Sequence, residues 1–124
     1  MRSTARQQMT DISAQVSRVV CDSGIGDGLC HVFVSHTTAA VTVNENADPD
    51  VQRDLIAAFE AMVPQMTFHH AEGNSDAHLL SSLIGESVIL PVESGQLRLG
   101  TWQGIFFVEL DGPRRRKVQV SLIG

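Results

Sequence analysis

The chain has 124 residues, of which 43% are hydrophobic and 19% charged, so it can bury one substantial core and is not a disordered segment. Nine Lys and Arg against 14 Asp and Glu give a net charge of −5, and only 5% of residues are aromatic. These values exclude the basic footprint and the stacking platform of a nucleic-acid-binding protein. No apolar run approaches the roughly 20 residues of a membrane span, and the opening segment lacks the apolar stretch of a secretory signal. We therefore expect one cytoplasmic domain over residues 1–124, with no nucleic-acid or membrane partner.

Apolar patterning predicts a series of strands. The first is expected over residues 12–21, where Ile12, Ala14 and Val16 share one parity. Residues 29–36 are apolar on both faces, which is typical of a central strand. The other strands are expected over 41–45, 87–92, 103–110 and 116–123. The turn-forming run at 111–114, Asp-Gly-Pro-Arg, predicts that the last two strands form a hairpin.

Two helices are predicted between these strands. Asp48 suits the N-cap of a long helix that starts at Pro49 and stops before Pro64, and its apolar stripe should pack on a sheet. A short helix is expected over 76–84, with Gly85 at its end. Its predicted buried stripe consists of Leu79, Leu80, Leu83 and Ile84. The order of elements is that of an α+β single domain with a mostly antiparallel sheet, one long helix and one short helix.

Two other patterns allow both a structural and a functional interpretation. Cys21 and Cys30 lie among apolar residues and do not form a Cys-x-x-Cys pair, which favours two buried, reduced thiols over a disulfide. The run from Arg114 to Lys117 supplies four of the nine positive charges. It is either a solvated strand end that discourages edge-to-edge pairing or a grip for an anion. The first interpretation is favoured.

Three histidine positions lie in polar surroundings at the ends of predicted elements: His36, His69 or His70, and His78. Imidazole is a common zinc ligand, and a catalytic zinc site uses three protein ligands and leaves one position open. The three positions are therefore a candidate zinc site, although their spacing matches no local metal-binding motif. The alternative is that the histidines are buried, neutral and hydrogen-bonded, as expected for His31 on an apolar strand.

Other polar residues lie close to these histidines in sequence. Glu45 shares a predicted strand face with Val41 and Val43, and a half-buried carboxylate needs a partner, which favours a functional role. Asn74 and Asp76 either cap the short helix or line the site. A serine hydrolase is disfavoured because the chain has no Gly-x-Ser-x-Gly elbow, and neither cysteine has the basic neighbour that a nucleophile needs.

Three blocks of sequence resemble the YjbQ-like family, whose members are described as secondary thiamine-phosphate synthases. The blocks are Val34–Asn46, which contains His-Thr-Thr-Ala-Ala and Asn-Glu, Glu72–Leu79, and Leu99–Ile105, which contains Gly-Thr-Trp-Gln. The resemblance extends from about Asp11 to Gly124. It implies a barrel-like or strongly curved sheet, a homotrimer, and a cleft that holds the motif residues between subunits.

The resemblance also implies roles for particular side chains. It places His36, His70 (or His69) and His78 on a divalent metal, with zinc as the ion that suits these ligands. Glu45 and His36 become candidate catalytic residues. The candidate substrate-binding residues are Asn74, Thr101, Trp102 and Gln103, with Arg98 and Arg116 available to contact a substrate phosphate.

These observations lead to two hypotheses about function. The first is a small metal-binding enzyme that acts on phosphorylated small molecules, with thiamine-phosphate synthase-type activity. The second is a non-catalytic trimeric protein that binds a small anionic metabolite. The chain has no Asp-rich diphosphate motif and no Gly-rich phosphate loop, so the residues alone give the synthase activity little independent support.

Overall fold

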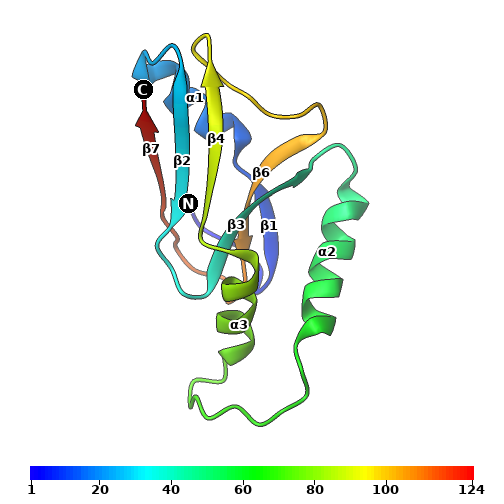
Figure 1. Cartoon of the computed structure of the whole chain (residues 1–124). Helices are drawn as coiled ribbons and strands as arrows, with labels where there is room; N and C mark the ends of the chain where they lie inside the picture. Colours follow the sequence, from blue (N-terminus) through cyan, green and yellow to red (C-terminus); the bar gives the residue numbers. More distant parts are fainter.

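A computed structural model describes all 124 residues, which form seven strands and three helices (Figure 1). In chain order the elements are β1 (Gln8–Asp11), α1 (Ser13–Ser23), β2 (Gly28–Val34), β3 (Ala39–Glu45), α2 (Pro49–Met62), α3 (Ser75–Ile84), β4 (Ser87–Glu93), β5 (Gln96–Leu97), β6 (Gln103–Glu109) and β7 (Val118–Ile123). None of the three helices has the length and apolar character that crossing a membrane requires.

The strands form two curved antiparallel sheets. One has the strand order β1-β6-β3, and the other has the order β5-β4-β2-β7. β3 pairs with β6 over its whole length, from Ala39 opposite Glu109 to Glu45 opposite Gln103. β2 lies between β4 and β7, which confirms its predicted central position. The predicted α+β class with a curved antiparallel sheet is confirmed.

The core has two parts because β6 is buried on both faces. Ile105 and Phe107 belong to the larger cluster, which includes α1 and residues of both sheets. Phe106 and Val108 belong to a second cluster, against which apolar residues of α2 and α3 pack. The molecule therefore consists of the four-stranded sheet, the three-stranded sheet and a helical layer, and β6 runs through its centre (Figure 1).

The predicted strand over 12–21 is wrong, because these residues form α1. Ile12, Val16 and Val20 recur every four residues, so they share one helix face, and all three are buried in the larger cluster. The parity of Ile12, Ala14 and Val16 suggested a strand, but Ala14 is exposed. α1 ends at Gly24, whose φ of 75° is the left-handed conformation that favours glycine at a helix C-terminus.

The predicted hairpin of the last two strands is also wrong. β6 pairs with β1 and β3, whereas β7 pairs with β2 in the other sheet. Residues 110–117 therefore cross from one sheet to the other instead of turning back. Another short hairpin is present instead, in the glycine-rich segment where β5 pairs with the end of β4.

The two predicted helices are confirmed, with corrections to what they bury. The Asp48 carboxylate accepts a hydrogen bond from the Asp50 amide at 2.9 Å, and Pro49 begins α2 as expected. No residue of α2 is fully buried, because its stripe only partly covers the second cluster. In α3, Leu80 is buried but Leu83 is 60% exposed. Cys30 is buried and Cys21 is exposed, so only one of the two thiols lies where it was expected.

The contrast between Leu80 and Leu83 gives a matched test of the second cluster. Replacing Leu80, which is 1% exposed, with Ala should lower the free energy of unfolding by about 2–5 kcal/mol, because the change leaves a cavity. Leu83→Ala on the same helix should change it by less than about 0.5 kcal/mol. Chemical denaturation of both variants measures the difference, and equal losses would contradict this packing.

Candidate functional site

A buried ion pair holds the crossing between the two sheets in place. The Arg116 guanidinium is 4% exposed and bonds the carboxylate of Glu109, which is 1% exposed, with an Nε to Oε1 distance of 2.9 Å. Arg116 also donates to the carbonyl and hydroxyl oxygens of Thr38. The Ser3 hydroxyl and the amides of residues 110 and 111 donate to Glu109 as well. The carboxylate of Glu109 and the guanidinium of Arg116 therefore both have hydrogen-bond partners within the protein.

This arrangement fixes the charge of Glu109 and corrects the expectation for Arg116. Burial alone would raise the pKa of the Glu109 carboxyl, but the hydrogen bonds from Arg116 and Ser3 outweigh it and hold the pKa below its usual value. Arg116 was expected to contact a substrate phosphate. Its guanidinium is instead used by Glu109 and Thr38, so its role here is structural.

His36 lies next to this ion pair. Its Nε2 accepts a hydrogen bond from the Lys117 amide at 2.9 Å, which fixes the ring with an unprotonated Nε2. Burial lowers the pKa of His36, and the nearby charge of Arg116 lowers it further. The imidazole is thus held neutral, with its proton on Nδ1 and its one acceptor nitrogen, Nε2, engaged by the Lys117 amide.

His70 and His78 meet at the start of α3. Their ring centroids are 5.5 Å apart and the rings are nearly perpendicular. The Nε2 atom of His70 lies 3.8 Å from a carboxylate oxygen of Glu72. Two of the three predicted histidine positions thus lie together, but no group of three or more His, Cys, Asp or Glu side chains is arranged to hold a metal ion within the chain.

Two buried oxygen atoms without hydrogen-bond donors lie at the same start of α3. They are Oδ1 of Asn74 and Oδ1 of Asp76. The amide nitrogen of Asn74 donates to Asp111 at 2.9 Å, and the other oxygen of Asp76 bonds Arg6 at 2.7 Å. The side chains are therefore fixed in place while one acceptor on each stays free, as expected of residues that can receive a ligand donor or a cation.

The remaining predicted site residues form a separate group. Glu45 pairs in register with Gln103, and the Asn46 amide donates to the Trp102 carbonyl at 2.9 Å. Trp102 is 64% exposed, and Thr101 is exposed beside it. Arg98 lies in the same connection before β6 and forms an ion pair with Glu93 at 3.3 Å.

The two groups lie at opposite ends of β3. Thr38, beside the Glu109 carboxylate, directly precedes the strand, and Glu45 is its last residue. A strand of seven residues spans roughly 20 Å at about 3.3 Å per residue. One chain therefore does not bring Glu45 to His36, and a cleft that holds both residues would have to lie between subunits.

Sequence reasoning missed the carboxylate that organises one end. Glu109 shares a strand face with Ile105 and Phe107, both of which are buried. A charge on an otherwise apolar strand face indicates a buried partner. The same pattern is present at Glu45 and at Glu109, but only Glu45 was predicted from it. Asp111, which receives the Asn74 amide, was also missed because it was assigned to a hairpin turn.

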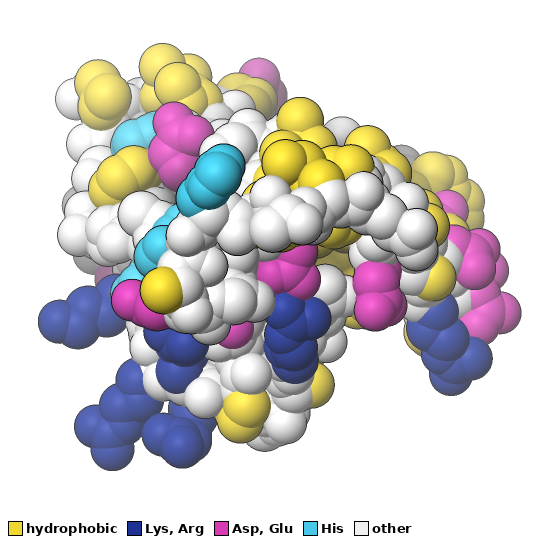
Figure 2. Space-filling model, turned by 90° about the horizontal axis from the view of Figure 1, so that it is seen from below, with side chains coloured by type: hydrophobic (Ala, Val, Ile, Leu, Met, Phe, Trp, Pro, Cys, Tyr) yellow, Lys and Arg dark blue, Asp and Glu magenta, His cyan; other side chains and the backbone are white.

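Figure 2 shows one face of the molecule, seen from below relative to Figure 1. Histidine side chains gather on one side of this face, close to Lys and Arg side chains. Arg115 and Lys117 are exposed. This part of the surface presents imidazole, cationic and carboxylate groups together, since Asp and Glu side chains also lie against the histidines.

The fold and this end of the molecule define a small α+β protein with two curved antiparallel sheets and a histidine-bearing end next to a buried ion pair. The sequence profile of the family described as UPF0047 protein YjbQ-like matches residues 1–124. The chain belongs to this family.

Relatives and solved structures agree with that assignment over nearly their full length. The UPF0047 protein MJ1081 of Methanocaldococcus jannaschii is 45% identical over all of this chain and 91% of its own length. The UPF0047 protein YugU of Bacillus subtilis is 43% identical, over all of this chain and 96% of its own. A crystal structure of an uncharacterised YjbQ/UPF0047 protein from Clostridium acetobutylicum has a TM-score of 0.96 and 48% identity, covering 99% of this chain and 96% of that one.

The lowered pKa of His36 predicts a pH-dependent stability. The folded protein favours the neutral ring, so the contribution of His36 is complete above the unfolded pKa of about 6.5 and is lost as the pH falls below it. Denaturation between pH 7.5 and 5.5 should therefore show stability falling with pH. His36→Gln should reduce the slope, and His69→Gln, at an exposed position, should keep it. Identical slopes in all three proteins would contradict the neutral assignment.

The buried ion pair should be costly to break from either side. Arg116→Met or Glu109→Leu alone should lower the free energy of unfolding by about 3–5 kcal/mol, because each leaves a buried unpaired charge. The double variant should recover part of that loss. A double-mutant cycle by chemical denaturation measures the coupling, and purely additive losses would show that the two groups do not depend on each other.

Proposed function

We propose that this protein binds a divalent metal ion, zinc by ligand type, at its histidine-bearing end and uses it to hold a phosphorylated small molecule. The observation that carries the proposal is the pair formed by His70 and His78. With Zn–N distances of about 2.0–2.1 Å and tetrahedral angles, two imidazole centroids on one ion lie roughly 5 Å apart. The 5.5 Å separation in the structure is close to that value.

The surroundings of this pair support the assignment of further ligands. Residues 64–70 lie outside the helices and strands, so His70 is at the end of a segment that no sheet or helix holds in place. The free oxygen atoms of Asn74 and Asp76 lie at the adjoining helix start, and carboxylate oxygens also bind zinc. His36 is the third histidine of the proposal, and coordination through its Nε2 would replace the hydrogen bond from the Lys117 amide. A bound ion would polarise a phosphate oxygen or a water molecule at its open position.

The charge at this end suits an anionic substrate. Arg115 and Lys117 are exposed and form no ion pair, so both are free to attract a phosphate group. The thiamine-phosphate synthase-type reaction, which joins a pyrimidine pyrophosphate to a thiazole phosphate, has substrates of this class. In this reaction the chain's cations and histidines would bind and orient the phosphates.

A homotrimer would resolve the separation of Glu45 from the histidines. Leu29, Ile89 and Ile123 are exposed on the outer face of the four-stranded sheet, and no layer of this chain covers them. Assembly through such a face would leave the Glu45 end of one copy free to approach the His36 end of another, where Glu45 could act as an acid or base.

The second candidate function is a trimeric protein that binds a small anionic metabolite without turning it over. The separation of Glu45 from His36 along β3 favours this candidate. Mixing a pyrimidine pyrophosphate with a thiazole phosphate and assaying for the joined product distinguishes the two. Product formation that is lost in Glu45→Gln supports the enzyme, and tight binding without product supports the carrier.

Zinc titration by isothermal calorimetry tests the metal site. The wild-type protein should bind zinc stoichiometrically, and His70→Ala and His78→Ala should each weaken binding by about 10–100-fold through loss of a ligand. His69→Ala is the matched control, because it removes the adjacent imidazole and should leave the affinity unchanged. A larger loss in His69→Ala than in His70→Ala would exchange their roles, and unchanged affinity in both His70→Ala and His78→Ala would overturn the proposal.

A further inference from the structure

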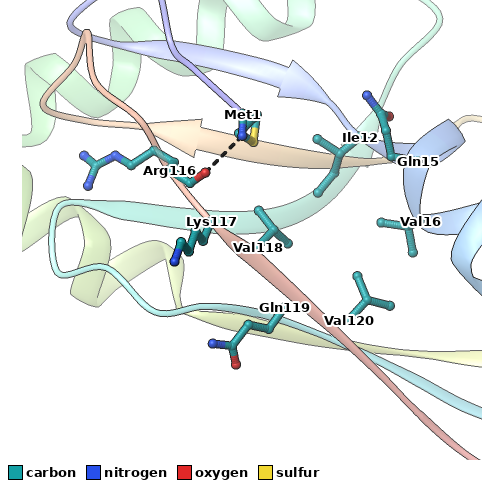
Figure 3. Close-up of a pocket in the computed structure, with 9 residues that line it drawn as sticks. All are labelled: Met1, Ile12, Gln15, Val16, Arg116, Lys117, Val118, Gln119 and Val120. Atoms are coloured by element: carbon teal, nitrogen blue, oxygen red, sulfur yellow. Dashed lines mark hydrogen bonds between the residues drawn. The ribbon is translucent and has the colours of Figure 1, made fainter.

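A pocket lies between α1 and β7, and Arg116 and Lys117 line the side of it that adjoins His36. Ile12 and Val16 line it from one side and Val118 and Val120 from the other, with Gln15 at its margin (Figure 3). Its volume is about 440 Å³, the space of about 15 water molecules at about 30 Å³ each. The pocket opens to the surface and more than half of its lining residues are hydrophobic, so it can receive apolar side chains from outside the chain.

The backbone of β7 next to this pocket has an unpaired edge. The Val34 amide of β2 donates to Glu86 at 2.8 Å, so Val34, Val32 and Cys30 direct their backbone groups toward β4. The alternate residues of β2 therefore bond β7, at Gln119, Ser121 and Ile123. By the same alternation, Val118 and Val120 direct their N–H and C=O groups away from β2, where β7 has no neighbouring strand.

The same edge already accepts strand pairing just before β7. Met1 and Arg116 exchange two backbone hydrogen bonds, of 2.9 and 3.1 Å, and Arg2 pairs antiparallel with Arg115. Arg116 has the same parity as Val118 and Val120, so its bonded edge is continuous with theirs. Beyond this pairing, the outward-directed positions Val118, Val120 and Leu122 of the edge strand β7 have no neighbouring strand.

We propose that the free edge of β7 binds an extended peptide segment of another protein, which adds to the sheet as an antiparallel strand. Residues opposite Val118 and Val120 would direct their side chains to the same face as these valines, into the apolar pocket. The residues between them would face outward beside Gln119 and Lys117. The partner segment therefore alternates apolar and polar residues, and the pocket selects the apolar ones.

The charge on this edge defines one further feature of the partner. Lys117 is exposed and takes part in no ion pair, and no acidic residue lines the pocket. An acidic side chain opposite Lys117 would be matched there. Met1 occupies the position opposite Arg116, so the bound segment leaves the edge immediately after its acidic residue. This surface includes neither His70 nor His78, and the Lys117 amide connects it to His36.

Fluorescence polarisation with a designed probe tests the proposal. The probe is a fluorescein-labelled peptide amide with the sequence Val-Thr-Val-Thr-Leu-Asp, in which Leu meets Val118 and Asp meets Lys117. It should bind saturably and about tenfold more tightly than the permuted peptide Val-Val-Leu-Thr-Thr-Asp. Methylation of the Leu nitrogen should abolish binding, because it removes the hydrogen bond to the Val118 carbonyl.

Variants of the protein separate the edge, the pocket and the charge. Val120→Pro removes only an edge N–H that is unpaired in the fold, and it should weaken binding about fivefold. Gln15→Trp, at an exposed helix position, should block the pocket. Lys117→Glu should weaken binding about threefold, whereas Arg53→Glu on α2 makes the same charge change elsewhere and should have no effect.

The outcomes decide the proposal in either direction. Circular dichroism establishes that each variant is folded, and Gln15→Trp retains the test if Val120→Pro fails to fold. Equal affinity for the two peptides, or wild-type affinity in Gln15→Trp, overturns strand addition. A third outcome also overturns strand addition: the wild-type protein binds no peptide, and light scattering shows an oligomer that dissociates in Lys117→Glu. The edge would then be covered by a second copy of the chain.

Discussion

The buried pair of Glu109 and Arg116 is the interaction on which the arrangement of both sheets depends. It lies where the chain leaves β6 and approaches β7, and it also binds Ser3 and Thr38, which are far away in sequence. Removing two charges from water costs several kcal/mol per ion, and only complete hydrogen bonding offsets this cost. The surrounding donors meet that condition, so the crossing has one well-defined geometry.

The same interaction positions the histidine-bearing end. Thr38 holds the Arg116 side chain from the segment that precedes β3, and His36 lies two residues earlier in that segment. His36 in turn accepts the amide of Lys117, the residue after Arg116. The neutral state of the ring follows mainly from its burial, to which the nearby Arg116 charge adds, and the Nε2 lone pair of the neutral ring is used by the Lys117 amide.

The length of β3 sets a limit on what one chain can do. Seven consecutive pairs with β6 hold this strand extended, so Glu45 cannot swing toward His36 without loss of the sheet that forms the core. Chemistry that needs both residues requires a second copy, whereas binding needs only one end. This constraint follows from strand geometry alone, and the expectation of one cleft for Glu45 and the histidines did not take it into account.

Local signals in the sequence were sufficient for some elements and misleading for others. The capping of α2 by Asp48 and the central position of β2 depend on neighbouring residues, and both were predicted correctly. α1 was misassigned because its short apolar run fits both the two-residue period of a strand and the 3.6-residue period of a helix. Only the burial of Ile12, Val16 and Val20 in the folded protein decides between them. The hairpin of β6 and β7 failed for another reason. Its turn residues are suitable, but the partner strands are chosen by contacts with β1 and β2 that no local pattern encodes.

Within the predicted site, the sequence indicated the position of some residues correctly and of others wrongly. The histidines at 70 and 78 lie together as their polar surroundings indicated, yet Arg116 is buried although its basic cluster suggested exposure. Three of the four residues in that cluster remain on the surface, at the point where the chain joins the free edge of β7. Lys117 belongs to both regions, because its amide holds His36 and its neighbour Val118 begins the unpaired edge. The histidine-bearing end and the free edge of β7 are therefore joined through one peptide unit. A change in the backbone at either place must be accommodated at the other.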